Sequence, residues 1–365
     1  MRVLFYVSDP AWSGSVRAFA TLAHTLAARG SQVTFACAAE SVVEERLAGG
    51  DFEVFPLETT GGTFAQARRL RRVLRDRFVE AVAVHTEREH LAASIATRMA
   101  ERGAVIRRTP AGARLDVGWQ TGLATRLAAT GFVFATQGER DAATTPRRAM
   151  EPVVVDLGVD ADAIARLAPA SRIALNAGPG ERILACVYEP RARGRAATVL
   201  RTLALLAPRH PSLRLVLVGR GSDHEDLRMH AAALGITDSV SLLGEREDAT
   251  SVLRAAELGW VAAEQDDAAF GALDLMACGV PVLVERGTVA QRYIADSISG
   301  VLLPPADAAA SAAAVSSLLA HGDERRAMGQ AGQARVRREH SEGLMADRFV
   351  AAVEQARDRT LWRVR

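Results

Sequence analysis

Lysine is absent from this sequence, and all 45 of its basic residues are arginine. Chemistry that needs an ε-amino group is therefore excluded. This removes Schiff-base and pyridoxal phosphate enzymes, protein kinases, and P-loop NTPases with their phosphate-binding lysine. The function has to rest on other side chains.

Cysteine is scarce. Cys37, Cys186 and Cys278 lie far apart and show no C-x-x-C spacing. Three scattered cysteines support neither a disulfide framework nor a zinc site. We therefore expect a protein of a reducing, cytoplasmic compartment that holds no metal ion.

Long apolar runs are also missing. No stretch approaches the roughly 18 consecutive apolar residues of a membrane-spanning helix. The first apolar stretch, Val3–Val7, is shorter than the core of a signal peptide and predicts a buried strand. The 43 acidic residues leave a net charge of +2, so no global field attracts nucleic acid, and we expect no nucleic acid partner.

Short β-branched runs alternate with helical patterns from end to end, which is typical of parallel α/β units. Strands of a first set are expected over Val3–Val7, Val33–Cys37, Ala81–His85, Val105–Arg108, Phe132–Ala135 and Val153–Val155. Strands of a second set are expected over Ile183–Val187, Leu213–Val218, Val240–Leu242, Leu258–Ala262, Val282–Val284 and Val301–Leu303. Helices are expected over Val16–Arg29, Ala196–Leu206, His224–Leu234, Phe270–Cys278, Ala308–His321 and Gly343–Arg359.

The two strand sets indicate two Rossmann-like domains that face a cleft, which is an α/β fold. We expect a first domain over 1–160, a linker over 161–180 and a second domain over 181–340. The helix within 341–365 belongs to neither set and could cross back to the first domain. Ligands of such folds bind at the carboxyl ends of the strands.

A buried strand followed by Gly219-Arg220-Gly221 is the first candidate site. Glycines let the backbone turn tightly and approach a ligand, and the next helix offers its N-terminus to negative charge. The alternative is a turn that merely connects strand to helix.

The second candidate is Asp266–Val282. Asp266 or Asp267 could cap a helix at its N-terminus, with Gly279 after its end. Asp274 would then lie about two turns inside, where a buried carboxylate could accept hydrogen bonds from the hydroxyls of a ribose. The alternative is that the first two carboxylates only cap the helix while Asp274 faces water.

Together these segments resemble the donor-binding domain of family 4 retaining glycosyltransferases, the glycosyl transferases group 1, which have the GT-B fold. Met276–Val282 matches the family's Met-Ala-x-Gly-x-Pro-Val run, with Asp266 and Asp274 in the places of its two glutamates. The resemblance implies that Asp266 holds the donor sugar and Asp274 the ribose. It also implies that the backbone amides around Ala269, Phe270 and Gly271 receive the diphosphate.

The same resemblance implies a diphosphate-binding loop after the first strand of this domain. Arg193, followed by Gly194, stands in the place of the family's Lys-Gly, and Tyr188 stands where its first Arg is expected. Arg191 could reach in from a shifted register. An arginine can replace a lysine as a phosphate partner. The alternative is that both arginines are solvated loop charges.

In the first domain, Gly14 and Ser15 belong to a segment that resembles the family's acceptor-side loop. The family's histidine, after the strand Val105–Arg108, is replaced here by Pro110. His85, at the end of its own strand, is the nearest alternative, and its other reading is a hydrogen-bonded structural residue.

A basic stretch contains Arg68, Arg69, Arg71 and Arg72, with Leu70, Leu74 and other apolar residues on one helical face. It could hold the protein at an anionic membrane surface near a lipid-linked acceptor. The alternative is the solvated side of a helix packed on the sheet.

These residues predict a glycosyltransferase that uses a nucleoside diphosphate sugar and a lipid-linked or saccharide acceptor, retains configuration and needs no cofactor. The motif departs from the family in its shortened acids, in Asp267 and Ala269 in the places of glycines, and in Tyr188. These departures motivate a second hypothesis, a catalytically reduced protein that acts as a binding or regulatory partner. A third hypothesis is a sugar-nucleotide 2-epimerase on the same fold.

Overall fold

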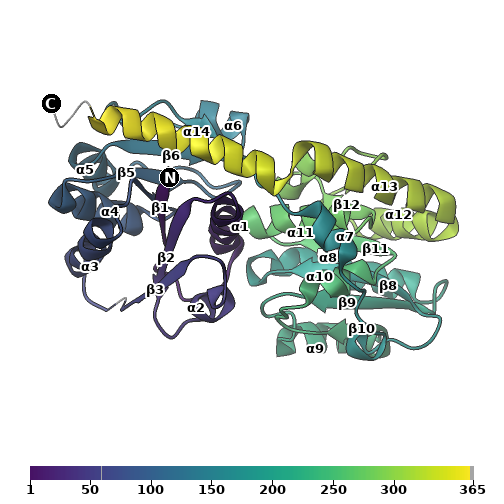
Figure 1. Cartoon of the computed structure of the whole chain (residues 1–365). Helices are drawn as coiled ribbons and strands as arrows, with labels where there is room; N and C mark the ends of the chain where they lie inside the picture. The colour runs from purple at the N-terminus through teal and green to yellow at the C-terminus, as the bar shows by residue number, and fades with distance from the viewer. Residues whose placement is uncertain (59, 362–365) are drawn as a thin grey trace. The chain divides into compact units, whose positions relative to one another are not determined.

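A computed structural model describes residues 1–58 and 60–361. The chain divides into two compact units. Unit 1 is Met1–Leu157 together with the chain from Glu342 on, and unit 2 is Gly158–Ser341. Each unit is built around one parallel sheet with helices packed against it (Figure 1).

Unit 1 has a seven-stranded sheet in the order β3-β2-β1-β4-β5-β6-β7. Its strands are β1 (Arg2–Tyr6), β2 (Gln32–Ala38), β3 (Glu53–Leu57), β4 (Ala81–Val84), β5 (Ala104–Arg108), β6 (Thr130–Phe134) and β7 (Val153–Val154). Its helices are α1 (Gly14–Ala28), α2 (Val42–Leu47), α3 (Thr63–Asp76), α4 (Glu87–Ala100), α5 (Trp119–Leu127), α6 (Gln137–Ala142) and α14 (Glu342–Leu361).

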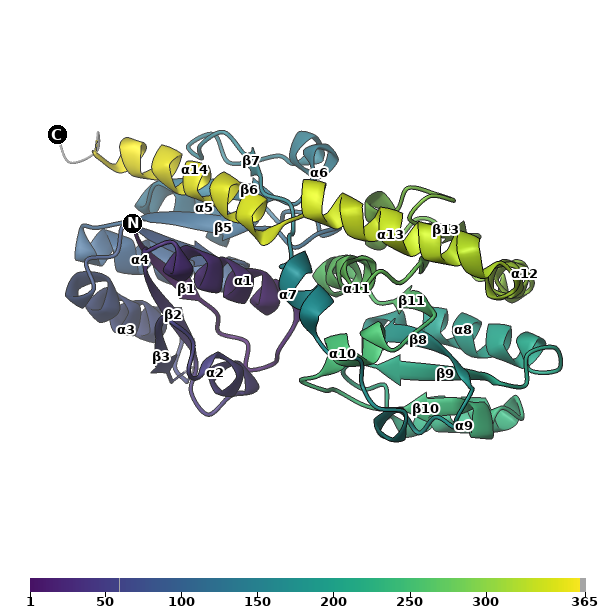
Figure 2. The same cartoon turned by 45° about the vertical axis from the view of Figure 1, so that its right-hand side comes forward.

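Unit 2 has a six-stranded sheet in the order β10-β9-β8-β11-β12-β13, and Figure 2 shows β8, β9 and β10 side by side. Its strands are β8 (Arg182–Tyr188), β9 (Leu213–Val218), β10 (Val240–Leu242), β11 (Leu258–Ala262), β12 (Val282–Glu285) and β13 (Gly300–Leu303). Its α-helices are α7 (Ala161–Arg166), α8 (Arg193–Leu206), α9 (Glu225–Ala233), α10 (Ala249–Arg254), α11 (Gln265–Ala277), α12 (Ala308–Ala320) and α13 (Gly322–Glu339). Short 3-10 turns are η1 (Ile173–Leu175), η2 (Pro190–Ala192), η3 (Thr237–Ser239) and η4 (Val289–Tyr293).

Every strand expected from the sequence is confirmed to within two residues at each end. The fold class is likewise confirmed as α/β with two Rossmann-like parallel sheets. Strand β3 and several helices, the longest of them α4 and α13, were not among the elements expected from the sequence. Edge strand β3 contains Pro56 and is only partly buried, so its apolar pattern is weak. Most of α13 is polar, and its few buried positions include Gly329 and Gly332, which carry little apolar signal.

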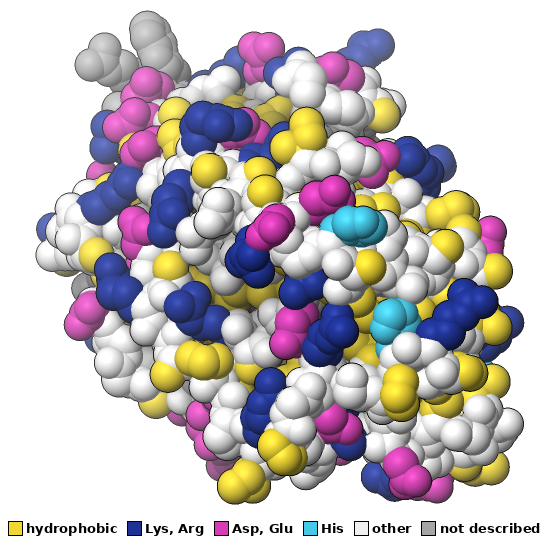
Figure 3. All heavy atoms as spheres, turned by 90° about the vertical axis from the view of Figure 1, so that its right-hand side faces the viewer, with side chains coloured by type: hydrophobic (Ala, Val, Ile, Leu, Met, Phe, Trp, Pro, Cys, Tyr) yellow, Lys and Arg dark blue, Asp and Glu magenta, His cyan; other side chains and the backbone are white. Residues whose placement is uncertain are grey.

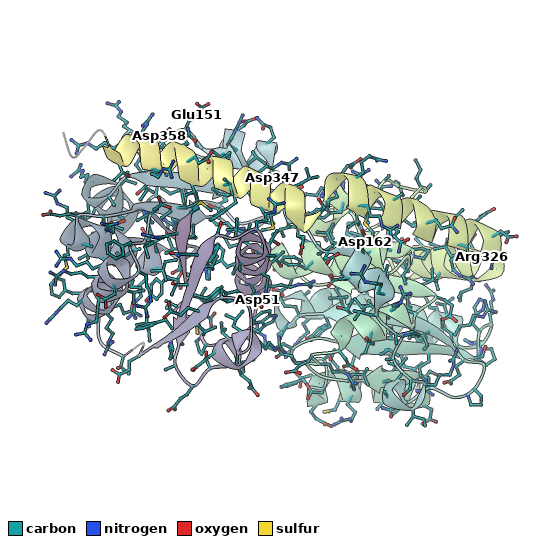
Figure 4. The ribbon with its side chains drawn as sticks, viewed as in Figure 1. Asp51, Glu151, Asp162, Arg326, Asp347 and Asp358 are labelled. Atoms are coloured by element: carbon teal, nitrogen blue, oxygen red, sulfur yellow. The ribbon has the colours of Figure 1, made fainter. Side chains whose placement is uncertain are left out.

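Helix α14 packs on the sheet of unit 1, although it follows unit 2 in the chain. Figure 1 shows it lying along β5 and β6. Its Met345, Phe349 and Val353 are buried, and the ring of Phe349 stacks on Phe5 of β1 with centroids 5.6 Å apart. Arg29, just after α1, forms an ion pair of 2.5 Å with Asp347, which Figure 4 labels on α14. This apolar face assigns α14 to the first sheet.

Helix α11 packs tightly on the sheet of unit 2. A methyl group at Gly259 of β11 would lie only 2.3 Å from the side chain of Leu275, so only glycine fits there. At another edge of unit 2, α7 is tied to α13 by an ion pair of 2.8 Å between Asp162, labelled in Figure 4, and Arg337. These contacts fix the C-terminal half of α11 against the sheet and α7 against α13.

The surface shown in Figure 3 carries arginine and acidic side chains that are interspersed, consistent with the net charge of +2. Within residues 1–58 and 60–361, no helix is both long and apolar enough to cross a membrane.

Candidate functional site

The chain order in unit 2 reverses between two neighbouring strands. Strand β8 pairs with β11 in the middle of the sheet, while the chain after β8 continues to β9 on one side and the chain after β11 continues to β12 on the other. The loops that follow such strands leave in opposite directions and open a crevice at the carboxyl edge. The loops after β8 and β11 therefore form the candidate site.

Glu189 joins these two loops. Its carboxylate is buried and accepts hydrogen bonds from the backbone N–H of Arg191 at 2.7 Å and from that of Glu264 at 3.2 Å. The Glu189 backbone N–H donates to the carbonyl of Ala262 at 3.2 Å. The sequence analysis did not single out Glu189, although it precedes Pro190 at a strand end, where an acidic residue can fold back on the turn.

Arg191 contacts residues of both loops. Its Nε donates to Glu189 at 2.8 Å, and its guanidinium lies 3.2 Å from the Gln265 side chain and 3.8 Å from the Asp267 carboxylate. The hydrogen bond that Arg191 donates to the Glu189 carboxylate raises the pKa of Arg191 above its ordinary value. Since the side chain is fixed at several points, it is not a freely solvated loop charge.

Arg193 and Arg195 lie on the first turn of α8. Arg193 forms an ion pair with Asp226 at 2.9 Å and a hydrogen bond with the hydroxyl of Tyr188. Arg195 lies 2.9 Å from Glu264 and 3.7 Å from Glu285, whose pKa is raised by burial against the opposing effect of Arg195. Arg195 was missed, although it stands only two residues after Arg193.

Helix α11 begins earlier than predicted. Its N-cap is Glu264, and the first hydrogen bond of the helix runs from the N–H of Ala268 to the carbonyl of Glu264. The expectation that Asp266 or Asp267 caps this helix is therefore wrong. Gln265, the first helical residue, has a φ of 50°, a left-handed conformation that is uncommon for a residue with a side chain.

The backbone amides of Ala269, Phe270 and Gly271 cannot serve as the predicted diphosphate donors, and this part of the prediction is wrong. All three residues are buried beyond the first turn of α11, where each N–H bonds the carbonyl four residues earlier. The N–H groups that an α-helix leaves outside its own bonding are those of its first turn. The first turn of α11 thus comprises 265–267, beside Arg191.

Asp266 and Asp274 are both buried, so the alternative that Asp274 faces water is wrong. Eight residues along a helix correspond to about 12 Å, which separates the two carboxylates along α11. Asp266 lies in the first turn, and Asp274 lies in the last turn, close enough to Cys278 to raise the pKa of its thiol together with burial, the larger cause.

Gly219 and Gly221 follow β9, with φ values of 129° and 72°. A methyl group at Gly219 would lie 2.2 Å from the carbonyl oxygen of Tyr188 at the end of β8. The turn after β9 therefore passes directly against β8. Helix α9 begins only at Glu225, so the Gly-x-Gly turn does not open directly into its N-terminus.

In unit 1, Gly14 and Ser15 are the first two residues of α1, and Ser13 caps the helix. His85 follows β4, which pairs with β1. The ring of His85 packs edge-on against Phe19 of α1, with centroids 5.5 Å apart. The three predicted acceptor-side residues therefore lie at one edge of this sheet.

The basic residues on α3 divide into two groups. Arg69 donates to the carbonyls of Glu58 and Thr60, and Arg71 donates to the carbonyl of Met99 on α4. Arg68 and Arg72 are exposed. All four line an open groove of about 540 Å³ between α3 and the edge strand β3.

Comparison with known proteins agrees with this geometry. Residues 169–335 match the family model of glycosyl transferases group 1, a segment that contains the whole candidate site of unit 2. A D-inositol 3-phosphate glycosyltransferase of Segniliparus rotundus is 30% identical over 171 residues, 45% of this chain and 38% of that protein. A phosphatidyl-myo-inositol mannosyltransferase of Mycolicibacterium smegmatis is 34% identical over 135 residues, 36% of this chain and 33% of that protein. The chain thus spans less than two fifths of the length of these relatives.

Solved structures resemble the whole chain. A glycosyltransferase from Rickettsia africae covers 97% of this chain and 98% of its own with a TM-score of 0.82 and 14% identity. HepE from Anabaena, in complex with UDP and glucose, covers 97% of this chain and 99% of its own with a TM-score of 0.79 and 15% identity. These likenesses show that the fold is the GT-B fold of glycosyltransferases. The family match of residues 169–335 supports the group 1 glycosyltransferases within that class.

Proposed function

We propose that this protein is a glycosyltransferase that transfers a sugar from a nucleoside diphosphate sugar to an acceptor with retention of configuration. The observation that carries the proposal is the position of Arg191 and Arg195 beside the N-terminus of α11, with Arg193 between them in the chain, inside the segment that matches the glycosyltransferase family. Guanidinium groups and the first turn of a helix are the two main protein partners of a diphosphate.

The leaving diphosphate carries the negative charge that develops as the sugar departs. Arg191 and Arg193 would stabilise it, with Arg195 as a further partner, and the first-turn amides of α11 would replace the three amides predicted from the sequence. No metal ion is needed where arginines supply this charge. Asp266 would orient the donor sugar, and Asp274 would bind the ribose.

When the donor binds, its diphosphate can replace the present carboxylate partners of Arg191 and Arg193. The ion pair of Arg193 with Asp226 is half exposed, and the contact of Arg191 with Asp267 is long. Exposed ion pairs contribute about 0 to 1 kcal/mol, so a diphosphate can displace them at little cost. The contact of Arg191 with the buried carboxylate of Glu189 would stay and keep the guanidinium in place.

The acceptor side is proposed for unit 1, with Gly14, Ser15 and His85. The relatives act on inositol 3-phosphate and phosphatidyl-myo-inositol by name, which supports a polyol or lipid-linked acceptor. We also propose peripheral contact with an anionic membrane surface through the groove of α3, chiefly Arg68 and Arg72, because Arg69 and Arg71 are engaged with neighbouring carbonyls.

Calorimetry with UDP, GDP, UDP-glucose and GDP-mannose tests the proposal. We expect one of the two nucleoside diphosphates and its nucleotide sugar to bind. Addition of a polyol should then release the nucleoside diphosphate from that nucleotide sugar. If none of these four compounds binds to the folded protein in calorimetry or raises its melting temperature, the regulatory-partner hypothesis is favoured. A new nucleotide sugar formed without an acceptor would indicate an epimerase instead.

A further inference from the structure

Glu89 of unit 1 is a carboxylate with no solvent exposure. It accepts hydrogen bonds from the backbone N–H of Ser8 at 2.6 Å, the hydroxyl of Ser8 at 2.8 Å and the backbone N–H of Thr86 at 3.0 Å. Ser8 follows β1 and Thr86 follows β4. These two strands are neighbours from which the chain continues in opposite directions, so Glu89 occupies the switch point of the first sheet.

Glu89 does more than cap α4. Thr86 and Glu89 form a reciprocal capping box, which by itself accounts for one hydrogen bond of the carboxylate. The two bonds from Ser8 come from another strand end. Burial alone raises the pKa of Glu89, but the electrostatic interaction with His85 and the hydrogen bonds from Ser8 and Thr86 outweigh it and hold the pKa below its ordinary value.

His85 is oriented by this carboxylate. Its backbone N–H lies 3.3 Å and its Nδ1 3.5 Å from Oε2 of Glu89, and its side chain is only 8% exposed. Nδ1 is buried without a hydrogen bond, and Phe19 packs against the ring. The nearest group that can stabilise a proton on Nδ1 is therefore Glu89, and a neutral ring with its proton there carries a lone pair on Nε2.

Nε2 differs from Nδ1 in its surroundings. It is not among the buried unbonded side-chain atoms, and it has no hydrogen-bond partner within residues 1–58 and 60–361. His85 follows β4 at the same edge of the sheet at which α1 begins with Gly14 and Ser15, and Nε2 is the ring nitrogen that remains available there.

We propose that Nε2 of His85 accepts a hydrogen bond from a hydroxyl of the sugar acceptor, and that Glu89 is the positioning residue that fixes the ring and its tautomer. This inference rests on the proposed function and names the chemistry of its acceptor side: a neutral hydroxyl donor such as a polyol or saccharide. Orientation of one hydroxyl toward the donor sugar is what such a contact supplies.

The first experiment reads the tautomer and needs no acceptor. The protein is labelled with ¹⁵N in its eight histidines, and long-range ¹H–¹⁵N spectra are recorded. The signal that disappears in His85→Gln is assigned to His85. We expect the proton of His85 on Nδ1, a mixed tautomer in Glu89→Gln, and an unchanged tautomer in Ser8→Ala, which removes one hydrogen bond of Glu89 but keeps its charge. A proton on Nε2 in the unmodified protein, or no response to Glu89→Gln, overturns the proposal.

The second experiment measures UDP release from UDP-glucose with the most reactive of myo-inositol, D-inositol 3-phosphate and glucose; if none of them reacts, the tautomer experiment alone decides the proposal. His85→Phe fills the volume without a hydrogen bond, whereas His85→Gln keeps an acceptor atom near the place of Nε2. We expect kcat/KM for the acceptor to fall about tenfold or more in His85→Phe and to stay within about threefold in His85→Gln.

The affinity for UDP-glucose, measured by calorimetry, distinguishes a failure of the His85 proposal from a failure of the proposed glycosyltransferase function. Unchanged affinity together with unchanged kcat/KM in His85→Phe, or an equal loss in both variants, overturns the role of His85 and leaves the glycosyltransferase proposal standing. If the unmodified protein binds neither UDP nor UDP-glucose, the choice of donor is at fault, and the tautomer experiment still decides whether Glu89 positions His85.

Discussion

The carboxylate of Glu189 accepts hydrogen bonds from both the backbone N–H and the Nε of Arg191, at 2.7 and 2.8 Å. A buried acid two residues before an arginine thus fixes the direction of its guanidinium. The same acid accepts a hydrogen bond from the N–H of Glu264, which joins the loops after β8 and β11. A cation fixed before a ligand arrives costs less ordering on binding.

Removal of this carboxylate should destabilise the protein. We expect Glu189→Ala to lower the free energy of unfolding by about 1 to 3 kcal/mol, because the N–H groups of Arg191 and Glu264 lose a buried partner. Urea denaturation measures the change. Asp226→Ala, which removes the exposed partner of Arg193, is the control and should cost at most about 1 kcal/mol. Equal effects would contradict the role of Glu189.

Two substitutions on α11 should change donor affinity in opposite directions. Asp274→Asn should weaken binding of the preferred nucleoside diphosphate about tenfold, because a charged acceptor for ribose hydroxyls is lost. Asp267→Asn should strengthen it about two- to fivefold, since a negative charge leaves the helix N-terminus. Calorimetry measures both, with circular dichroism to verify folding. Unchanged affinity in Asp274→Asn would remove this residue from the site.

Gly219→Ala should be far more damaging than Gly235→Ala. Both glycines have positive φ, but only the methyl group at position 219 would meet another atom closely, the carbonyl oxygen of Tyr188 at 2.2 Å. We expect about 1 kcal/mol of destabilisation at Gly235 and more than about 3 kcal/mol at Gly219. Thermal unfolding compares them, and similar melting temperatures would refute the close approach.

His90 should make the protein sensitive to acid. Burial, and to a lesser degree the charge of Arg107, lowers the pKa of His90 from 6.5 to about 3. The unfolded chain takes up a proton below about pH 6.5 that the folded protein does not. This contribution is therefore complete above about pH 6.5 and is lost as pH falls toward 3, by up to about 1.4 kcal/mol per pH unit. Urea titrations at pH 7, 6 and 5 should show a shallower slope in His90→Gln. Parallel slopes would contradict the neutral, buried state.

The groove of α3 should bind anionic vesicles. We expect the double variant Arg68→Glu, Arg72→Glu to lose roughly tenfold or more in cosedimentation with vesicles rich in phosphatidylglycerol, because each exposed arginine near the surface contributes about 1 kcal/mol. Arg201→Glu with Arg209→Glu, exposed on unit 2, is the matched control. Equal retention of all three proteins would remove membrane contact from the proposal.

Much of the fold could be predicted because parallel strands are buried on both faces and read as continuous apolar runs, as in Leu213–Val218. Edge strand β3 and the polar helix α13 lack that signal. The start of helix α11 was harder to predict from the sequence. Residues 265–269 carry no apolar pattern that marks a start, and the structure begins the helix at Gln265, which moved the usable amides away from Ala269, Phe270 and Gly271.

The sequence by itself determined the residue types, and these excluded all lysine chemistry and placed acids and arginines after the correct strands. Their pairing was decided by the tertiary structure, because Glu189 and Glu264, or Ser8 and Glu89, lie far apart in the chain and meet only where parallel strands end side by side. Local sequence patterns indicate which residues are buried and whether a segment has the periodicity of a helix or a strand. Which carboxylate holds which arginine or histidine depends on strand order, and strand order is set by packing over the whole sheet.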